Sequence, residues 1–386
     1  MKGFRKDLLG CRGMIESSLC SVWVLSMLLF LSACEPPLGK PLDGREIPML
    51  HSSLLRIIEC DGYTAVEVKN PWGKGLFQRY LLVSSDSALP QELPEGVLLR
   101  TPLKRTILFS GVHASLFEEL SAIGSVSGVC DARYFYSGTL ESYIAQGLVA
   151  DCGSSLNIDA EKVVMLAPDA IFVLPFENGG YGKLDRMEYP LVECAEYMEA
   201  SPLGCAEWCR FYARLFEKGD TGDSIFNAVK SAYDSVMSIT SQVSDRPKLM
   251  CELKSTSAWY MPGGNSTMGR MYADAGADYI LAGNESNGSV PLAFETVLGK
   301  AADADIWLMK YNSAENKSYG LLASEVDGYT SFAPFKRRNI FACNTRYRNV
   351  FEETSFHPEL LLKELAAIFH PGLFPDYTLM YYEKMR

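Results

Sequence analysis

The pattern of apolar and polar positions changes once along the body of the chain. Three short apolar runs, beginning at Leu54, read "LLRIIEC", "YTAVEVK" and "RYLLVSS" and are separated by the turn-forming stretches "DG" and "NPWGKG". Runs of this length bounded by such turns are typical of antiparallel strands. From Arg105 onward, β-branched runs alternate with helical stretches, as in parallel α/β layers. The pattern predicts a small β-rich extension ahead of a larger α/β fold.

The α/β part contains an internal repeat. "EKVVMLAPDAIFVL" (Glu161–Leu174) aligns without a gap with "ETVLGKAADADIWL" (Glu295–Leu308). Each copy reads as a helix that opens on a glutamate, then a turn and a buried strand. Strand-like runs lead into loops and helices ahead of both copies, at "RTILFSG" and at "PKLMCEL". The same order of elements therefore occurs twice, which predicts two similar lobes.

One helix is predicted to join these lobes. The segment "GDSIFNAVKSAYDSVMSITSQV" (Gly222–Val243) places apolar residues at helical spacing, and Asp220, Thr221 or Asp223 could cap its start. Two lobes joined in this way leave a cleft, and ligands of open α/β sheets bind outside the carboxyl ends of the strands. We therefore divide the chain into a signal (1–33), a tether and β-rich extension (34–104), an N-terminal lobe (105–220), a linking helix (221–244) and a C-terminal lobe (245–386).

The N-terminus has the layout of an export signal. Basic residues precede an apolar core from Val22 to Leu31, which is too short to span a bilayer and is followed by Ser32-Ala33. The ending Leu-Ser-Ala-Cys resembles a bacterial lipoprotein signal, which implies cleavage before Cys34 and acylation of that cysteine. An ordinary cleaved signal and an uncleaved anchor are the alternatives, and translation could begin at Met14. The expected location is outside the cytoplasm, lipid-anchored to a membrane facing the periplasm or the cell surface.

Composition narrows the chemistry. The net charge of −11 argues against a nucleic-acid partner. Export favours disulfides, and Cys130 with Cys152 is the pairing we expect, although sequence does not fix connectivity. Cys205 and Cys209 lack the neighbouring ligands of a zinc site and are interpreted as core thiols. With only four histidines in the chain, no metal site is predicted.

Between residues 105 and 375 the chain resembles the extracytoplasmic substrate-binding proteins of ABC importers for iron-siderophores, haem and cobalamin. Besides the two repeat copies, the shared features are "SPLGCAEWCRFYARLF", "WYMPGGNSTMGRMYADAGADYIL" and "HPELLLKELAAIFHPGLFP". The resemblance implies two Rossmann-like α/β lobes joined by a single long helix (a class III periplasmic binding protein). It further implies a small-molecule metal chelate held between the lobes, docking onto an ABC permease dimer with its ATPase subunits, and no catalysis. No cofactor is expected other than this ligand, an iron or cobalt chelate.

The family also suggests roles for individual residues. Members carry one acidic residue on each lobe that meets arginines of the permease, and the matching positions here are Glu161 and Glu295. The alternative is that each carboxylate simply complements the dipole of its helix. Five loops are expected to line the cleft: "GVHAS", "CDARYFYSG", "PFENGGYGK", "STSAWYMPGGNS" and "KYN".

Aromatic faces suit a flat macrocycle or catechol rings, and a basic group suits an anionic chelate. The predicted ligand contacts within these loops are Arg133, Tyr134, Tyr136, Tyr181, Trp259 and Tyr260, each with loop packing as its alternative. His113 could be an axial haem ligand, although a lone histidine is more often only hydrogen-bonded.

Two other classes of protein remain as alternatives. An exported hydrolase needs a nucleophile elbow, but "GSVSG" places Val126 at the serine position and "GGNST" lacks the closing glycine. An adhesion or glycan-binding lipoprotein would use the β-rich extension, and its α/β cleft would be filled by side chains.

Overall fold

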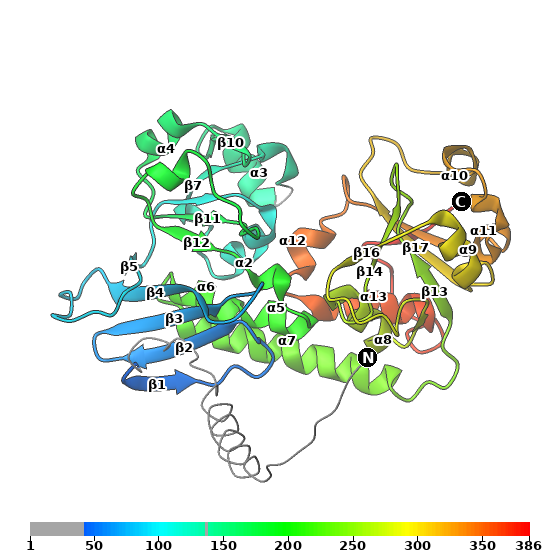
Figure 1. The fold of residues 1–386 in the computed structure, drawn as a ribbon, viewed down its shortest axis with the longest axis horizontal. Coiled ribbons are helices and arrows are strands. Elements are labelled where there is room, and N and C mark those ends of the chain that lie inside the picture. The colour runs from blue at the N-terminus through cyan, green and yellow to red at the C-terminus, as the bar shows by residue number, and fades with distance from the viewer. Residues whose placement is uncertain (1–41, 136–137) are drawn as a thin grey trace, which may run out of the picture. The chain divides into compact units, whose positions relative to one another are not determined.

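The computed structural model describes residues 42–135 and 138–386, and the account below concerns the unit Asp43–Arg386 (Figure 1). Cys34 and the predicted signal lie outside the described residues. Within the described ranges, every helix is too short or too polar to cross a bilayer.

The β-rich extension is a five-stranded sheet. Its strands are β1 (Gly44–Ile47), β2 (Leu55–Cys60), β3 (Tyr63–Lys69), β4 (Leu76–Ser84) and β5 (Val97–Thr101), in that spatial order. The three predicted runs are confirmed as β2, β3 and β4, which pair antiparallel. A further strand that the pattern did not predict, β5, runs parallel to β4 after a long connection.

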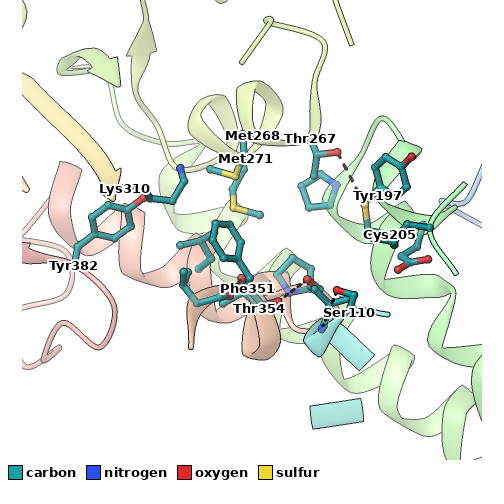
Figure 2. Close-up of a pocket in the computed structure, with 18 of the residues that line it drawn as sticks. Ser110, Tyr197, Cys205, Thr267, Met268, Met271, Lys310, Phe351, Thr354 and Tyr382 are labelled. Atoms are coloured by element: carbon teal, nitrogen blue, oxygen red, sulfur yellow. Dashed lines mark hydrogen bonds between the residues drawn. The ribbon is translucent and has the colours of Figure 1, made fainter. Parts of the chain in front are cut away.

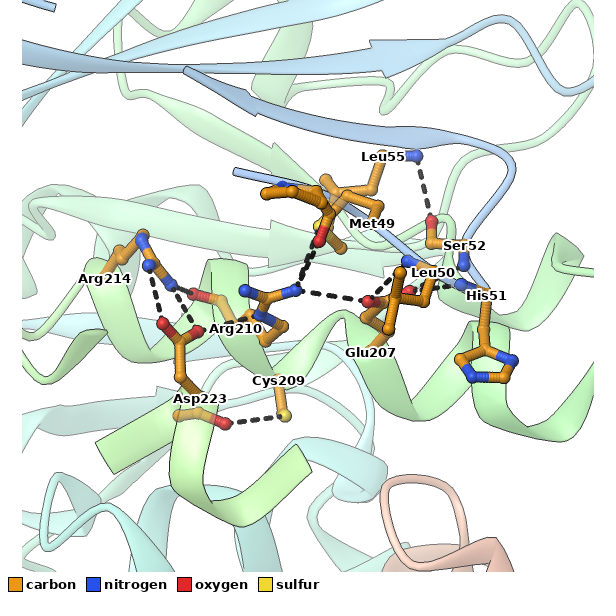
Figure 3. Close-up of polar contacts among 12 residues, drawn as sticks. Met49, Leu50, His51, Ser52, Leu55, Glu207, Cys209, Arg210, Arg214 and Asp223 are labelled. Carbon is orange, nitrogen blue, oxygen red and sulfur yellow. Dashed lines mark hydrogen bonds and ion pairs between the residues drawn. The ribbon is translucent and has the colours of Figure 1, made fainter. Parts of the chain in front are cut away.

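Two buried glutamates, Glu199 and Glu207, bind the segment between β1 and β2, and Figure 3 shows the contacts of Glu207. Glu207 accepts hydrogen bonds from the backbone N–H groups of Leu50, His51 and Ser52 at 2.8–2.9 Å. Glu199 accepts from the next two, those of Ser53 and Leu54, at 2.9 and 3.1 Å. We call residues 50–54 the strap. It has no regular secondary structure, yet all five of its amides are bonded to carboxylates.

The N-terminal lobe is a parallel sheet with strand order β12-β11-β6-β7-β8. Its strands are β6 (Thr106–Leu108), β7 (Val126–Val129), β8 (Ala150–Asp151), β11 (Ala170–Val173) and β12 (Leu191–Glu193), with the small hairpin β9 (Gly153–Ser154) and β10 (Asn157–Ile158). Its α-helices are α2 (Ala114–Glu119), α3 (Gly138–Ala145) and α4 (Ala160–Leu166). Nearly every side chain of β6 and β11 is buried, as expected for strands covered on both faces.

The connection between the lobes runs through α5 (Pro202–Glu207), α6 (Cys209–Arg214) and the long helix α7 (Gly219–Thr240). Helix α7 confirms the predicted linking helix, although it begins and ends one turn earlier than Gly222–Val243. Gly222 lies inside the helix, where α6 packs too closely for a larger residue. A Cβ on Gly222 would come within 2.4 Å of Ala213 Cβ. The predicted capping residues therefore lie within α7, where Asp223 accepts from Arg210 and Arg214 at 2.8 and 3.2 Å (Figure 3).

The C-terminal lobe is a sheet with strand order β15-β13-β17-β18-β19, parallel except for β19. Its strands are β13 (Lys248–Cys251), β15 (Asp278–Tyr279), β17 (Ile306–Tyr311), β18 (Ile340–Asn344) and β19 (Glu383–Lys384), with the hairpin β14 (Trp259–Pro262) and β16 (Ser289–Leu292). Its helices are α8 (Thr267–Asp274), α9 (Phe294–Ala301), α10 (Tyr319–Glu325), α11 (Ala333–Lys336), α12 (Val350–Thr354) and α13 (Pro358–Phe369).

The predicted repeat is present in the topology. The strands β7-β6-β11-β12 of one lobe correspond, in spatial and sequence order, to β15-β13-β17-β18 of the other. In each lobe the third of these strands in sequence (β11 or β17) follows the helix that opens on the repeated glutamate. The predicted fold class, two α/β lobes joined by one long helix with a β-rich extension, is confirmed.

The predicted disulfide is wrong. Cys130 and Cys152 are both buried free thiols. The other six cysteines of the described residues are unpaired as well. Cys130 and Cys152 directly follow the register pair Val129 and Asp151 on parallel strands β7 and β8. Burial raises the pKa of both thiols, which keeps them protonated and disfavours the thiolate that forms disulfides.

Candidate ligand-binding cleft

A cavity of about 490 Å³ lies between the two lobes (Figure 2). From the N-terminal lobe it is lined by the loops after β6, β11 and β12, at Ser110, Leu174 and Glu196 among others. From the C-terminal lobe it is lined by α8, by α12 and by Lys310 at the end of β17. Both lobes thus present the carboxyl ends of their strands to the cavity, where ligands of open α/β sheets bind.

The wall from the C-terminal lobe is mainly apolar. Met268 and Met271, one turn apart on α8, extend toward the cavity together with Phe351 of α12 (Figure 2). Helix α8 is held in place by Ser266, whose hydroxyl caps it by accepting from the N–H of Gly269 at 3.1 Å. A methionine and aromatic surface of this kind adapts to a large apolar ligand.

Two charged residues line this cavity from different lobes. Lys310 is ion-paired with Glu252; burial alone would lower the pKa of Lys310, but the Glu252 charge outweighs it and the pKa is raised. Glu196 is deeply buried, which alone would raise its pKa. The charge and contact of His113, with a hydrogen bond from Tyr212, outweigh burial and lower the pKa of Glu196. The cavity therefore carries one cation and one anion at neutral pH.

A second cavity of about 440 Å³ adjoins the first and shares Ser110, Val112, Leu174 and Phe351 with it. Its remaining lining includes the polar side chains of Asp131, Asn312, Thr345 and Arg348. An apolar chamber thus opens into a more polar one. A ligand that spans both would need an apolar body and a polar or charged rim.

Contacts at one side of the cleft join the lobes directly. Ser115 Oγ donates to the carbonyl of Glu352 at 2.5 Å. His357 Nε2 lies 2.9 Å from Glu119 of α2, and its Nδ1 lies 2.9 Å from Glu359. Burial alone would lower the pKa of His357, but the two carboxylates raise it to about 10. His357 is therefore a cation that bridges the N-terminal and C-terminal lobes.

Of the predicted ligand contacts, Tyr134 lines the second cavity, and the guanidinium of Arg133 lies 4.7 Å from the centre of its ring. Tyr136 lies outside the described residues. Tyr181 donates to Glu193 and packs in the N-terminal lobe, and neither it nor the half-exposed Tyr260 lines the two cavities.

The predicted ligand contact of Trp259 is wrong. This side chain is fully buried, and its Nε1 donates to the carbonyl of Cys251 at 3.1 Å. It packs against Trp307 and Phe332 in the core of the C-terminal lobe. Successive side chains of β14 point to opposite faces of the strand, so Trp259 faces the core while its neighbour Tyr260 faces solvent.

His113 does not line the two cavities either, so direct haem ligation is not supported. It is buried among aromatic rings of the N-terminal lobe, 3.2 Å from Glu196. Of the two cysteines interpreted as core thiols, Cys209 is buried whereas Cys205 lines the main cavity.

Sequence reasoning missed most of the C-terminal wall. The predicted loops reach the cavities except for "STSAWYMPGGNS", whose place is taken by the helix that follows it. Met268 and Met271 lie in that helix, and their spacing of one turn was the available signal. Phe351 and Tyr382 come from segments outside the repeat, where no pattern marked them.

Glu161 and Glu295 occupy equivalent places in the two lobes. Each is exposed and is the second residue of its helix, α4 or α9. The helices differ at their starts: Asp159 caps α4 by accepting from the N–H groups of Glu161 and Lys162 at 3.1 and 3.2 Å, whereas Ala293 provides no side-chain cap for α9. The docking role of both glutamates stays a prediction.

Comparison with known proteins identifies related chains. A family model described as "Periplasmic binding protein" matches residues 133–341. An uncharacterized lipoprotein of Methanocaldococcus jannaschii is 26% identical over 313 residues, which cover 77% of this chain and 73% of the relative.

Two solved structures share the fold at low sequence identity. A protein of an ABC-type Fe³⁺-hydroxamate transport system from Saccharomonospora viridis has a TM-score of 0.57 at 14% identity and covers 78% of this chain and 98% of its own. The vitamin B12 binding protein BtuF of Vibrio cholerae has a TM-score of 0.50 at 12% identity and covers 70% and 98%.

Proposed function

The chain belongs to the periplasmic binding protein family, and on this premise we propose that it is a membrane-tethered receptor that captures a metal chelate and delivers it to an ABC permease. The family resemblance predicted from the sequence is thereby confirmed, and the family is one of substrate-binding rather than catalytic proteins. The observation that carries the proposal is the cavity of about 490 Å³ between the lobes. An adhesion protein with a filled cleft does not account for this cavity.

The ligand we propose is a ferric siderophore, haem or cobalamin. Related folds include one named for Fe³⁺-hydroxamate and one named for vitamin B12. The methionine and aromatic wall favours a ligand with a broad apolar face, and Lys310 and Arg348 suit carboxylate or phosphate groups at its edge. Each of the two adjoining cavities falls within the range of about 300–1,000 Å³ that is typical of small-molecule sites.

Calorimetric titration of the purified full chain with haem, cyanocobalamin, a ferric hydroxamate and a ferric catecholate tests this proposal. One of the four should bind at a single saturable site. Phe351→Asp, which puts a charge into both cavities, should weaken that binding at least about tenfold. Leu156→Asp is the matched control, because Leu156 is exposed and lines neither cavity.

If none of the four ligands binds to the folded protein, the chelate proposal fails. If one binds but Phe351→Asp leaves the affinity unchanged, the cleft is not the binding site. Tryptophan fluorescence is a weaker readout here because Trp208, Trp259 and Trp307 are all buried in the cores.

For permease docking, we propose that Glu161 and Glu295 form the charge pair that the two permease subunits recognise. Both are exposed, and they occupy equivalent positions of the repeat. Reversing both charges (Glu161→Lys with Glu295→Lys) should abolish uptake while ligand affinity stays unchanged, since rim charges steer and orient association. The control is Asp86→Lys with Asp245→Lys, two exposed acids at other sites. Loss of ligand affinity in the first pair would contradict the docking role.

For the anchor, we propose acylation at Cys34. The lipoprotein relative supports export with a lipid anchor. Metabolic labelling with a tagged fatty acid should mark the wild-type chain and not Cys34→Ser. Equal labelling of both chains would exclude Cys34 as the acylated residue.

A further inference from the structure

Three side chains that commonly ligate metals converge beneath the cleft, within the N-terminal lobe. His113 ends the turn η1 (Gly111–His113), Cys194 follows β12, and Glu196 begins the turn η5 (Glu196–Met198). Their exposed fractions are 1%, 0% and 3%. A ring nitrogen of His113, Sγ of Cys194 and a carboxylate oxygen of Glu196 all lie within 4.8 Å of one another.

The imidazole of His113 is an unusual member of this core. Neither of its ring nitrogens makes a hydrogen bond with any residue that the structure describes. Nε2 lies 3.2 Å from Glu196 Oε1, close enough for an ion pair but without hydrogen-bond geometry. The rings of Phe117, Phe172, Tyr212 and Phe356 surround the imidazole. A buried polar group left in this way is rare and calls for a partner.

We propose that His113, Cys194 and Glu196 form a binding site for a divalent transition metal ion of the zinc class. Imidazole, thiolate and carboxylate are the ligands that Zn²⁺ uses in proteins, with bonds of about 2.0–2.3 Å. Ligand atoms of a tetrahedral site therefore lie about 3–4 Å apart, a spacing that the 3.2 Å separation of Nε2 and Oε1 already has. Sγ of Cys194 lies within 4.8 Å of both atoms and supplies the third ligand.

The surrounding contacts fit this role. Tyr212 donates to Glu196 Oε2 at 2.6 Å, which leaves Oε1 turned toward His113. Burial raises the pKa of the Cys194 thiol and so favours its protonated form when no metal ion is bound. The metal ion displaces this proton, which leaves to solvent as the thiolate–metal bond forms.

The site also touches the cleft. Glu196 lines the main cavity, so the same carboxylate that ligates the metal ion faces the space proposed for the chelate. Three protein ligands leave one coordination position for a water molecule or a group of the cleft ligand. This metal ion would be held by the protein itself, separately from any metal in the cargo, and the site stands whether or not the proposed cargo is correct.

Cobalt is a spectroscopic substitute for zinc that tests the site directly. The purified full chain in detergent is stripped of metal with a chelator and titrated with Co²⁺. We expect one equivalent to bind, with a thiolate-to-cobalt charge-transfer band and the visible bands of tetrahedral Co²⁺, and we expect Zn²⁺ to abolish both. Cys194→Ser should lose the charge-transfer band, whereas the control Cys209→Ser, another buried cysteine, should keep it.

The absence of a charge-transfer band in the wild-type protein would overturn the proposal and leave His113 and Glu196 as a buried ion pair. An undiminished band in Cys194→Ser, or its loss in Cys209→Ser, would also overturn it. Should Cys194→Ser fail to fold, His113→Asn serves as the second variant, and its affinity for Co²⁺ should fall at least about tenfold relative to wild type.

Discussion

In the N-terminal lobe the strands run β7-β6-β11-β12, and in the C-terminal lobe β15-β13-β17-β18 run in the same order. In both lobes an exposed glutamate stands second in the helix before the third of these strands. The lobes differ in what they present to the cleft. The N-terminal lobe contributes loops and the buried Glu196, whereas the C-terminal lobe contributes mainly apolar side chains from helices α8 and α12.

This difference shows which features of the repeated α/β lobe are constrained by packing and which are free to vary. The strand order and the position of the helix ahead of the third strand are set by packing against the sheet, so both lobes retain them. Residues at the carboxyl edges of the strands pack against the ligand or the opposite lobe, so each lobe fills this edge differently. Similarity between the lobes therefore predicts the frame of the site and not its lining.

A second comparison concerns buried carboxylates that hold irregular segments. Glu207 accepts from three strap amides next to the N-terminal sheet. Glu364 of α13, also fully buried, accepts from the amides of Met380, Tyr381 and Tyr382 at 2.7–2.9 Å in the C-terminal lobe. Each carboxylate replaces the ladder bonds that a strand would have given its segment.

The largest expected effect tests whether these two carboxylates are equivalent. Glu364→Gln and Glu207→Gln should each lower the free energy of unfolding by about 3 kcal/mol, because an amide NH₂ would face backbone donors in a buried site. Urea unfolding measures both, with the exposed Glu315→Gln as control. A near-neutral Glu207→Gln would mean that the strap adds little to the stability of the fold.

The next effect compares the two cleft walls through one phenylalanine from each. Phe351 and Phe176 are 54% and 60% exposed and both line the main cavity, but only Phe351 also lines the second. Phe351→Ala should weaken binding of the identified ligand about tenfold and Phe176→Ala about threefold, in line with the apolar area removed. Calorimetry measures both, and Met165→Ala, on the exposed face of α4, is the control. A larger loss in Phe176→Ala would reverse the assigned roles of the two walls.

A smaller effect concerns the contact that joins the lobes. The pKa of His357 is raised to about 10 in the folded protein, above the value of about 6.5 in the unfolded chain. Its contribution to stability is therefore complete below pH 6.5 and is lost as the pH rises toward 10. At pH 6, His357→Gln should be less stable than wild type by about 1 kcal/mol.

The free energy of unfolding should be measured for wild type and His357→Gln from pH 6 to pH 10. The difference between the two should fall toward zero as the pH rises. A difference that is constant with pH would mean that the His357 contacts contribute packing rather than charge. When Glu359 is replaced by Gln in both chains, the stability difference caused by His357→Gln should be smaller over the same pH range. The replacement removes one of the two carboxylates that raise the pKa of His357.

The smallest effect makes the two repeated helices alike. Asp159 caps α4, whereas α9 begins after Ala293, which has the extended backbone of a cap but no side-chain acceptor. Ala293→Asp should stabilise the protein by about 0.5 kcal/mol and Asp159→Ala should destabilise it by about 1 kcal/mol, as measured by thermal unfolding. Ala293→Asn provides a cap without added charge and should give a similar gain. A loss in both Ala293 variants would show that the α9 start cannot take a capping side chain.

The sequence was sufficient for the frame because packing leaves periodic signals. Strands β2 and β3, the repeated helices and the buried face of α7 all follow from apolar spacing. It was insufficient where a residue's environment depends on distant segments. Trp259 was assigned to the cleft because its loop should lie there, but the hairpin of β14 and β16 turns its side chain inward. His113 was seen as a lone histidine because Cys194 and Glu196 are far from it in the chain.

The hydrogen bonds of the strap should also slow the exchange of its amide hydrogens with solvent. Residues 50–54 would be classed as a loop, and loop amides usually exchange their hydrogen with solvent within seconds to minutes. Here five successive N–H groups are bonded to the buried carboxylates of Glu199 and Glu207. Their deuterium uptake should therefore follow that of the neighbouring β-sheet, so this irregular segment keeps its hydrogens for as long as a strand does.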